Sequence, residues 1–345
     1  MTLEPLRLPA NQPPQFYRGG DAIAALRGAP AESKFGPEDW VASATTMFGR
    51  ETTGLTRLPD GAWLRDAVER DATAWLGAKH VEALGTSTGL LVKLLDAGQR
   101  LPVHFHPDDA FAQRHFDSHF GKTEAWIVVG THGDDPRVYP GFKETLSKST
   151  VAEWTREQDV PSMLGALNSV PVAPGDTVYI PAGLPHAIGE GVFVVELQQP
   201  TDFSLTIEWR DFLASPEKGH LGLGFDTAIE ALDTSGWDAD RLDTIIRHTG
   251  GDTASTVDLL APGSEQFFRA EQLRTDELTT LSLDPSFAVL VVLGGEGTLR
   301  TEHGGEYPLA KGDTYVVPFD AGQTELAGTA TVIRCRPPAP EGRRG

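Results

Sequence analysis

Short apolar runs, separated by turns rich in glycine and proline, recur along most of the chain. The 345 residues include 37 glycines and 25 prolines, and most of these lie between the apolar runs. Runs of this length with such punctuation are typical of strands joined by tight turns. The pattern therefore predicts a mostly β fold, with strands at residues 89–95, 101–106, 124–129, 177–180, 191–197 and 204–209.

Helical patterns interrupt the predicted strands in three places. Residues 107–120 begin with Pro-Asp-Asp, and both residue types suit the first turn of a helix. Residues 149–158 and 160–168 form a second helical block, which precedes another predicted strand. Residues 220–232 and 238–249 form a third, which we interpret as a connector between two β regions.

A weak internal repeat predicts that the chain holds two related antiparallel barrels. The segment Pro-Gly-Asp-Thr-Val-Tyr-Ile-Pro at 174–181 is echoed by Lys-Gly-Asp-Thr-Tyr-Val-Val-Pro at 311–318. We expect a first domain at 1–212, a helical connector at 213–250 and a second domain at 251–345. The second domain has only His303, so we expect it to bind no metal and to be structural or modulatory. The tail after Arg336 is expected to be poorly ordered.

Charge and composition narrow the classes of partner. The chain has 29 basic and 49 acidic residues, a formal charge of −20, which disfavours binding to nucleic acid or to anionic membranes. No apolar run approaches a membrane span, and the N-terminus lacks the pattern of a secretory signal, so we expect a cytoplasmic protein. The single cysteine, Cys335, excludes internal disulfides and cysteine-rich metal sites, and we expect it to be buried on a late strand.

Three histidines and one glutamate are candidates for a metal site. His104 and His106 are two apart on a predicted strand, so both imidazoles project from one face. Glu124 opens the strand after the 107–120 helix, and His186 follows the Gly-Asp strand, so pairing within a barrel can bring all four together. Such a set suits one divalent ion of zinc, manganese, iron, cobalt or nickel. His115 and His119, four apart on the helix, are interpreted as surface or packing residues.

Lys93 is unusual because it interrupts the apolar strand Leu-Leu-Val-Lys-Leu-Leu at 90–95. A lysine in such a strand needs a partner or a task. A contact with substrate and a buried ion pair are both compatible with this position.

Several motifs occur together, in one order, between residues 36 and 202. They are His-Pro-Asp-Asp at 106–109, Gly-Lys-Thr-Glu-Ala-Trp at 121–126, Pro-Ala-Gly-Leu-Pro-His-Ala-Ile at 181–188 and Glu-Leu-Gln-Gln at 196–199. This combination resembles the type I mannose-6-phosphate isomerases of the cupin superfamily. The resemblance implies two jelly-roll barrels with inserted helices, the second degenerate. It also implies that His106, Glu124 and His186 are metal ligands, with zinc the first expectation, and that Lys122 lies in the active site.

The resemblance implies that the protein interconverts an aldose and a ketose, mannose 6-phosphate and fructose 6-phosphate, through an enediol. Such a reaction needs a base near the metal, and the candidates are Glu196, Glu208 and Lys122. The alternatives are an isomerase of an unphosphorylated sugar, a cupin oxygenase and a sugar-binding cupin, all using the same three histidines and glutamate. In each case the partner is a small molecule.

Two positions depart from the family's pattern. The family usually has Gln-x-His where this chain has His104-Phe105-His106. Thr206 stands where the family has an active-site arginine, and Arg210 lies four residues on. By strand parity Arg210 faces the same side as Thr206, so we expect Arg210, with Lys122 and Lys93, to bind the phosphate.

Overall fold

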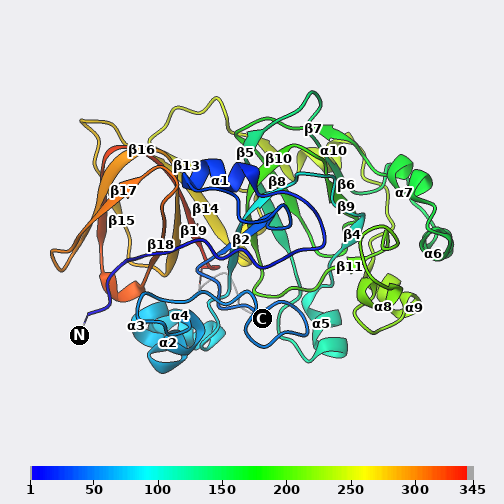
Figure 1. The fold of residues 1–345 in the computed structure, drawn as a ribbon, viewed down its shortest axis with the longest axis horizontal. Coiled ribbons are helices and arrows are strands. Elements are labelled where there is room, and N and C mark those ends of the chain that lie inside the picture. Colours follow the sequence, from blue (N-terminus) through cyan, green and yellow to red (C-terminus); the bar gives the residue numbers. More distant parts are fainter. Residues whose placement is uncertain (1, 340–345) are drawn as a thin grey trace.

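Two antiparallel β regions lie side by side along the long axis of the molecule (Figure 1). The computed structural model describes residues 2–339, so the last residues of the tail expected to be poorly ordered lie outside the described part. The mostly β fold predicted from the apolar runs is confirmed. The two-barrel description and the domain limits stay predictions.

The first region consists of two antiparallel sheets that enclose an apolar core. Trp126 and Val194 from one sheet share this core with Val138 and Ile188 from the other. The six-stranded sheet has the order β12-β8-β5-β10-β3-β2, and the five-stranded sheet has the order β11-β4-β9-β6-β7. The strands of the larger sheet are β2 (Glu38–Val41), β3 (Leu91–Asp96), β5 (Glu124–Thr131), β8 (Asp176–Ile180), β10 (Val192–Gln198) and β12 (Ile246–His248). Those of the smaller sheet are β4 (His104–Phe105), β6 (Arg137–Pro140), β7 (Val170–Pro171), β9 (His186–Ile188) and β11 (Leu205–Thr206).

Several predicted elements differ from the observed ones. The strands expected at 101–106 and 204–209 are reduced to the two-residue strands β4 and β11. The helix expected at 238–249 is wrong in its second half, because α10 (Ala239–Asp243) is followed by β12, which pairs with β8. Ile246 lies opposite Val178, and such a pairing between distant segments leaves no local pattern in the sequence.

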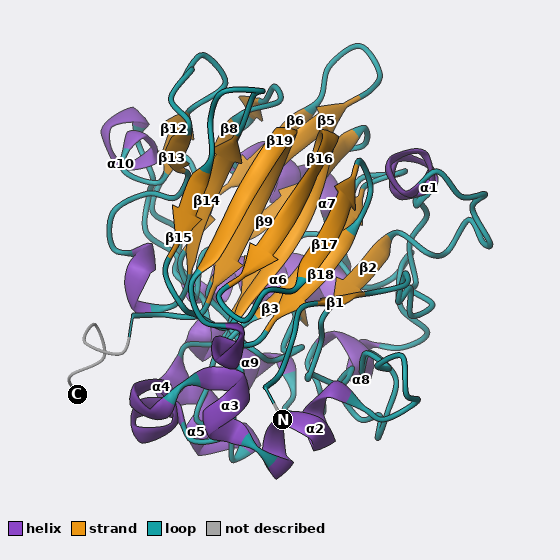
Figure 2. Cartoon of the chain, turned by 90° about the vertical axis from the view of Figure 1, so that its left-hand side faces the viewer, coloured by secondary structure: helices purple, strands orange, loops and turns teal. Residues whose placement is uncertain are grey.

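The helices lie at the ends and sides of the sheets. The predicted helical segments overlap α5 (Asp109–Phe116), α6 (Lys148–Glu157) and α7 (Val160–Ala166), and the helix expected at 220–232 is reduced to α9 (Phe225–Ala228) and a 3-10 turn at Ile229–Ala231. Residues outside them form α1 (Asp21–Arg27), α2 (Leu64–Arg70), α3 (Ala72–Leu76), α4 (Ala78–Leu84) and α8 (Pro216–Gly219). Figure 2 shows α2 to α5 gathered at one end of the strands. Helix α5 begins where the Pro-Asp-Asp motif predicts, since the Asp108 side chain accepts a hydrogen bond from the Phe111 N–H at 2.7 Å.

The second region is an eight-stranded antiparallel sheet that includes the N-terminal strand. Its strands are β1 (Leu6–Arg7), β13 (Thr256–Asp258), β14 (Arg269–Arg274), β15 (Leu281–Leu283), β16 (Ala288–Thr301), β17 (Glu306–Ala310), β18 (Thr314–Val317) and β19 (Thr324–Arg336). Strand β1 pairs with β18. Cys335 is buried on β19, as expected. One apolar core contains Val92 and Val195 of the first region with Val291 and Cys335 of the second, so the two regions share a core.

The two copies of the internal repeat adopt the same local structure. Gly175 and Gly312 both have positive φ, at 97° and 89°, and each precedes a strand. The carboxylates of Asp176 and Asp313 each accept a hydrogen bond from the backbone N–H three residues earlier, at 2.8 and 3.0 Å. The repeated Gly-Asp pair therefore forms equivalent turns, one before β8 and one before β18.

Candidate metal centre and cavity

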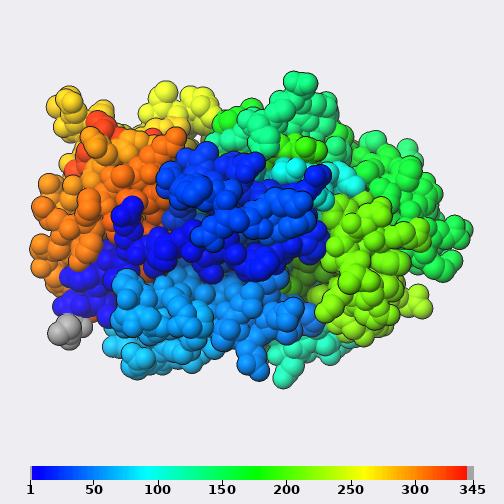
Figure 3. Space-filling view, viewed as in Figure 1, coloured from blue at the N-terminus to red at the C-terminus, as the bar shows by residue number. Residues whose placement is uncertain are grey.

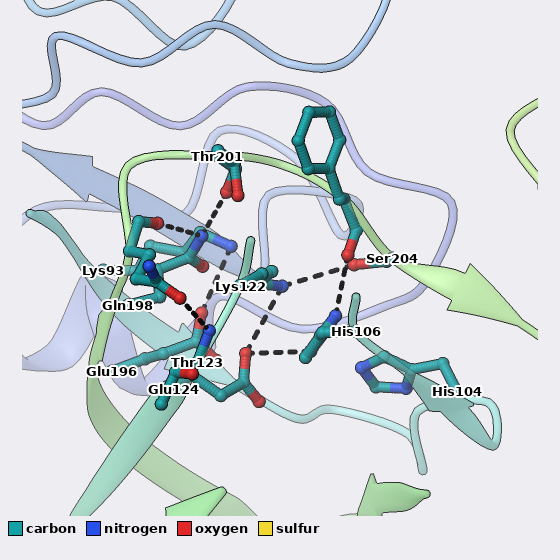
Figure 4. A network of polar contacts seen from close by, with 12 residues as sticks. Lys93, His104, His106, Lys122, Thr123, Glu124, Glu196, Gln198, Thr201 and Ser204 are labelled. Carbon is teal, nitrogen blue, oxygen red and sulfur yellow. Dashed lines mark hydrogen bonds and ion pairs between the residues drawn. The ribbon is translucent and has the colours of Figure 1, made fainter. Parts of the chain in front are cut away.

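The four predicted metal ligands come together from both sheets of the first region. Strand β4 carries His104 opposite His186 of β9, His106 follows β4 directly, and Glu124 begins β5. The Nε2 atoms of His104 and His186 are 3.0 Å apart. A Glu124 carboxylate oxygen lies 3.0 Å from Nε2 of His106, and the other lies 3.3 Å from Nε2 of His186. Figure 4 shows His106 and Glu124 directed toward each other, with His104 alongside.

The second ring nitrogen of each histidine fixes where its proton lies. Nδ1 of His104, His106 and His186 each lies 2.8 Å from a backbone carbonyl oxygen, of Pro102, Phe203 and Leu184 respectively. A carbonyl oxygen only accepts, so each neutral ring carries its proton on Nδ1 and leaves Nε2 as an acceptor.

Acceptor atoms therefore face one another without a proton between them. Nε2 of His106 is buried and has no hydrogen-bond donor facing it, and Oε2 of Glu124 has only the long contact of 3.3 Å with the Lys122 ammonium group. Buried polar atoms of this kind are costly unless something satisfies them. A divalent cation would do so, and a metal-bound histidine commonly donates its other N–H to a backbone carbonyl. The donor set thus fits a metal ion.

Burial and neighbouring charges hold these groups in the protonation states that bind metal. Burial, with help from His186 and His106, lowers the pKa of His104 well below its ordinary value, and burial lowers the pKa of His106 to about 3. Burial opposes ionisation of Glu124, but His106 and Lys122 hold its pKa well below the usual range. Neutral imidazoles and an ionised carboxylate are the forms that coordinate a metal.

Two lysines border this cluster. The Nζ atom of Lys122 lies 3.3 Å from Glu124 and 3.2 Å from the Ser204 hydroxyl. Lys93 is buried on β3, with its Nζ atom 3.2 Å from Glu196 and 3.4 Å from Glu38. Burial opposes the charge of Lys93, but the two carboxylates raise its pKa. Lys93 forms a buried ion pair and also lines the cavity, so the two alternatives for this residue are compatible.

Three further residues at the cavity were not identified from the sequence. Tyr17 donates a hydrogen bond of 2.5 Å to Glu38, and Asp202 lies on the cavity wall. Glu38 begins β2 and is followed by Asp39 and Trp40. Burial raises the pKa of both Asp202 and Glu196. Tyr17 has no local signal, because only the folding of the N-terminal segment across β3 brings it here.

The cluster opens into a cavity of about 760 Å³, which is in the range of sites for small molecules. Its inner wall includes His104, Glu124, Lys93, Lys122 and Glu196. Its outer part is lined by side chains that include Phe16, Phe48, Arg50, Phe212 and Lys218. On the face shown in Figure 3, the yellow-green segment that contains α8 meets the blue N-terminal segments.

Two predicted site residues lie elsewhere. The expectation that Arg210 faces the site is wrong, because β11 ends at Thr206 and strand parity does not extend further. Arg210 is exposed, is absent from the cavity wall and lies 5.7 Å from the Trp209 ring. Glu208 is also outside the cavity, where it pairs with Arg100 at 2.5 Å and accepts from the Val103 N–H. Thr206 itself lines the cavity.

The remaining histidines do not form a second metal cluster within residues 2–339. His104, His106 and His186 are the one group there whose ligand atoms lie within 4.8 Å of one another. His115 packs against the Phe111 ring, with centroids 4.3 Å apart, which agrees with a packing role. Among the same residues, no helix has both the length and the apolar character needed to cross a membrane.

Comparison with known proteins connects this cluster to an enzyme family. Residues 261–337 match the family described as the cupin domain of mannose-6-phosphate isomerase. The mannose-6-phosphate isomerase ManA of Bacillus subtilis is 30% identical over 264 residues, which cover 75% of this chain and 79% of that protein. A mannose-6-phosphate isomerase of Streptococcus mutans is 27% identical over 96% of this chain and 97% of its own length.

Solved structures show the same fold. A crystal structure of the mannose 6-phosphate isomerase from Bacillus subtilis aligns with a TM-score of 0.73 at 24% identity, covering 97% of this chain and all of that one. The apo enzyme from Salmonella typhimurium aligns with the same TM-score at 15% identity, covering 98% of this chain and all of its own. The chain belongs to the mannose-6-phosphate isomerase family.

Proposed function

We propose that this protein is a metal-dependent aldose–ketose isomerase that interconverts mannose 6-phosphate and fructose 6-phosphate through an enediol. The observation that carries the proposal is the proton-free convergence of three Nε2 atoms and Glu124 beside two buried lysines. The relatives named above support it, because both are mannose-6-phosphate isomerases and both align with most of this chain.

His104, His106, Glu124 and His186 would hold one divalent ion, with zinc the first expectation and manganese, iron, cobalt or nickel as alternatives. When bound, the ion supplies Lewis-acid stabilisation of negative charge on the sugar oxygens. The protein's own contribution is to orient the ligands through the three Nδ1 hydrogen bonds. Lys122, which contacts Glu124, also places a positive charge beside the site.

Proton transfer between the two sugar carbons needs a base, and Glu196 and Lys122 are the candidates within the cavity. Glu196 is held by Lys93, whose Nζ atom lies 3.2 Å from Oε1 of the carboxylate. Burial raises its pKa toward neutrality, which favours exchange of a proton with substrate. We assign the base to Glu196, and we assign to Lys122 the stabilisation of charge on a neighbouring oxygen.

A second candidate function is the isomerisation of an unphosphorylated sugar. It is favoured by Thr206, a neutral side chain on the cavity wall at the position where the sequence resemblance places an arginine. The choice between a phosphorylated and an unphosphorylated substrate depends on which cations of the cavity bind a phosphate. For the phosphorylated substrate we also propose a cytoplasmic location, because a doubly charged sugar does not cross a membrane unaided.

An isomerisation assay with metal-reconstituted protein tests the proposal. Mannose 6-phosphate and free mannose are supplied separately, in the absence of oxygen, and ketose formation is followed. Conversion of mannose 6-phosphate that stops on chelation supports the proposal. Turnover of free mannose at an equal rate would favour the second candidate. Oxygen consumption without isomerisation would indicate an oxygenase, and sugar binding without turnover a binding protein.

A further inference from the structure

The charges of the inner cavity offer a phosphate group no net attraction. Four carboxylates line it, against two lysines, and both lysines are already paired with carboxylates; the acids are Glu38, Glu124, Glu196 and Asp202. A divalent ion at the histidines would only bring this part of the cavity to neutrality. A phosphate of about two negative charges therefore needs further cations.

Two cations at the outer part of the cavity are free to supply this attraction. Arg50 and Lys218 both line the cavity and are exposed. Neither side chain has an ion pair or hydrogen bond within the described residues. We propose that Arg50 and Lys218, here called the mouth cations, form the subsite that binds the substrate's phosphate. This inference rests on the proposed function.

The turn that carries Arg50 is fixed to the cavity wall. The Phe48 N–H donates to the Asp202 carboxylate at 3.0 Å, and the Arg50 N–H donates to the Met47 carbonyl at 2.9 Å. The Phe48 ring packs edge-on against Phe203, with centroids 5.8 Å apart. A cation on an anchored turn loses less entropy on binding an anion than one on a mobile loop.

Lys218 is carried to the cavity by a close contact between α8 and β11. Gly219 is buried, and a Cβ atom added there would lie 2.7 Å from the Thr206 carbonyl oxygen. Helix α8 therefore lies directly on β11, and Thr206 pairs with His104 in the adjacent strand. Lys218 thus belongs to a helix that packs on the strand beside His104, whereas Arg210 does not line the cavity.

Glu217 is the opposing charge at this mouth. It is exposed and lines the same cavity, and its hydrogen bond to Ser215 lowers its pKa, so it is ionised near neutrality. If the mouth cations bind phosphate, Glu217 weakens that binding. Removing its charge should act in the direction opposite to removing either cation.

The test measures binding of mannitol 6-phosphate, which has no carbonyl group and cannot isomerise, by calorimetry to the metal-loaded full-length protein. Arg50→Gln and Lys218→Gln should each weaken its binding at least about tenfold, with binding of unphosphorylated mannitol and metal content unchanged. Arg50→Lys should retain most of the affinity, and Glu217→Gln should increase it. Arg300→Gln is the matched control, because Arg300 is exposed and pairs with Glu306 in the second region.

The inference would be overturned if Arg50→Gln and Lys218→Gln both bound mannitol 6-phosphate with wild-type affinity. It would also be overturned if only one of the two variants lost affinity for this ligand. It would also be overturned if wild-type protein bound mannitol 6-phosphate no more tightly than mannitol. Failure of the proposed function gives a different result. If mannitol 6-phosphate binds through the mouth cations but mannose 6-phosphate is not isomerised, the subsite stands and the isomerase proposal falls.

Discussion

Each candidate histidine ligand is oriented by a hydrogen bond to a backbone carbonyl oxygen. These three bonds hold the imidazoles with their Nε2 atoms toward a common point. The spacing of His104 and His106, with the motifs that contain Glu124 and His186, was enough to predict that these four side chains come together. The hydrogen-bond partners Pro102, Phe203 and Leu184 contribute only main-chain oxygens, which no side-chain pattern reveals.

Replacing one of these ligands should release the metal. In His186→Ala the affinity for the ion should fall by more than the roughly 10–100-fold that even an outer contact contributes. Metal content of the dialysed protein, measured by elemental analysis, checks this. His248→Ala is the matched control, because His248 pairs with Asp176 on the surface. Unchanged metal content in both His104→Ala and His186→Ala would exclude this site.

The assignment of the base predicts a separation between Glu196 and Glu208. Glu196→Gln should lower kcat by roughly 10²–10⁴-fold while metal content stays the same, because its carboxylate is proposed to move the proton. Glu208→Gln should leave kcat close to wild type and lower the free energy of unfolding, since it leaves Arg100 without its carboxylate partner. Steady-state kinetics and urea denaturation of both variants check this, and the reverse order of kcat values would transfer the role to Glu208.

At the scale of elements, the predicted strands are most accurate where both faces are buried. Strands β3 and β10 are buried along their whole length and lie close to the predicted ranges. The predicted strand at 204–209 is too long, since β11 ends at Thr206. This error affected the predicted site, because strand parity over residues 204–209 was the reason to place Arg210 there. The chain leaves the sheet after Thr206, where Gln158 receives the N–H groups of Trp209 and Arg210. A side-chain contact from a distant helix is not visible in local sequence.

The meeting of β4, β5 and β9 makes the metal-free protein sensitive to acid. The pKa of His106 is lowered to about 3, and that of His104 is also lowered, from an ordinary value of 6.5. Between these values the unfolded chain binds protons that the folded chain does not. The free energy of unfolding should therefore be highest above pH 6.5, where the histidines are neutral in both states. It should fall as the pH drops toward 3, by up to about 1.4 kcal/mol per pH unit for each histidine.

Urea denaturation of chelator-treated protein between about pH 7.5 and pH 5 measures this dependence. His106→Asn should show a shallower decline, because one of the depressed groups is gone. An unfolding midpoint that does not change over this range would show that the imidazoles gain their protons without loss of the fold.

At the scale of the whole molecule, the two β regions depend on each other. Strand β1 begins the chain and pairs with β18 near its end, and a single apolar core contains residues of both regions. The turn motif at 174–181 predicted a second related unit. The shared core has no counterpart in any local pattern, since it depends on how complete sheets pack.

We therefore expect that residues 1–250 do not form a stable protein on their own. Without residues 251–345, the fragment would expose apolar side chains such as Val92, Leu94 and Val195, each at a cost of roughly 1.5–3 kcal/mol. Soluble expression and thermal unfolding of the fragment check this. A fragment that unfolds cooperatively and holds metal would show that the first region is an independent domain.

The most direct test of the account compares conversion of mannose 6-phosphate to fructose 6-phosphate by three samples: metal-loaded wild type, chelator-treated wild type, and metal-loaded Glu196→Gln. The account predicts conversion in the first sample alone, with activity returning to the second when the metal is restored. Conversion that survives chelation, or equal rates in the wild type and Glu196→Gln with the same metal content, would contradict the proposed site.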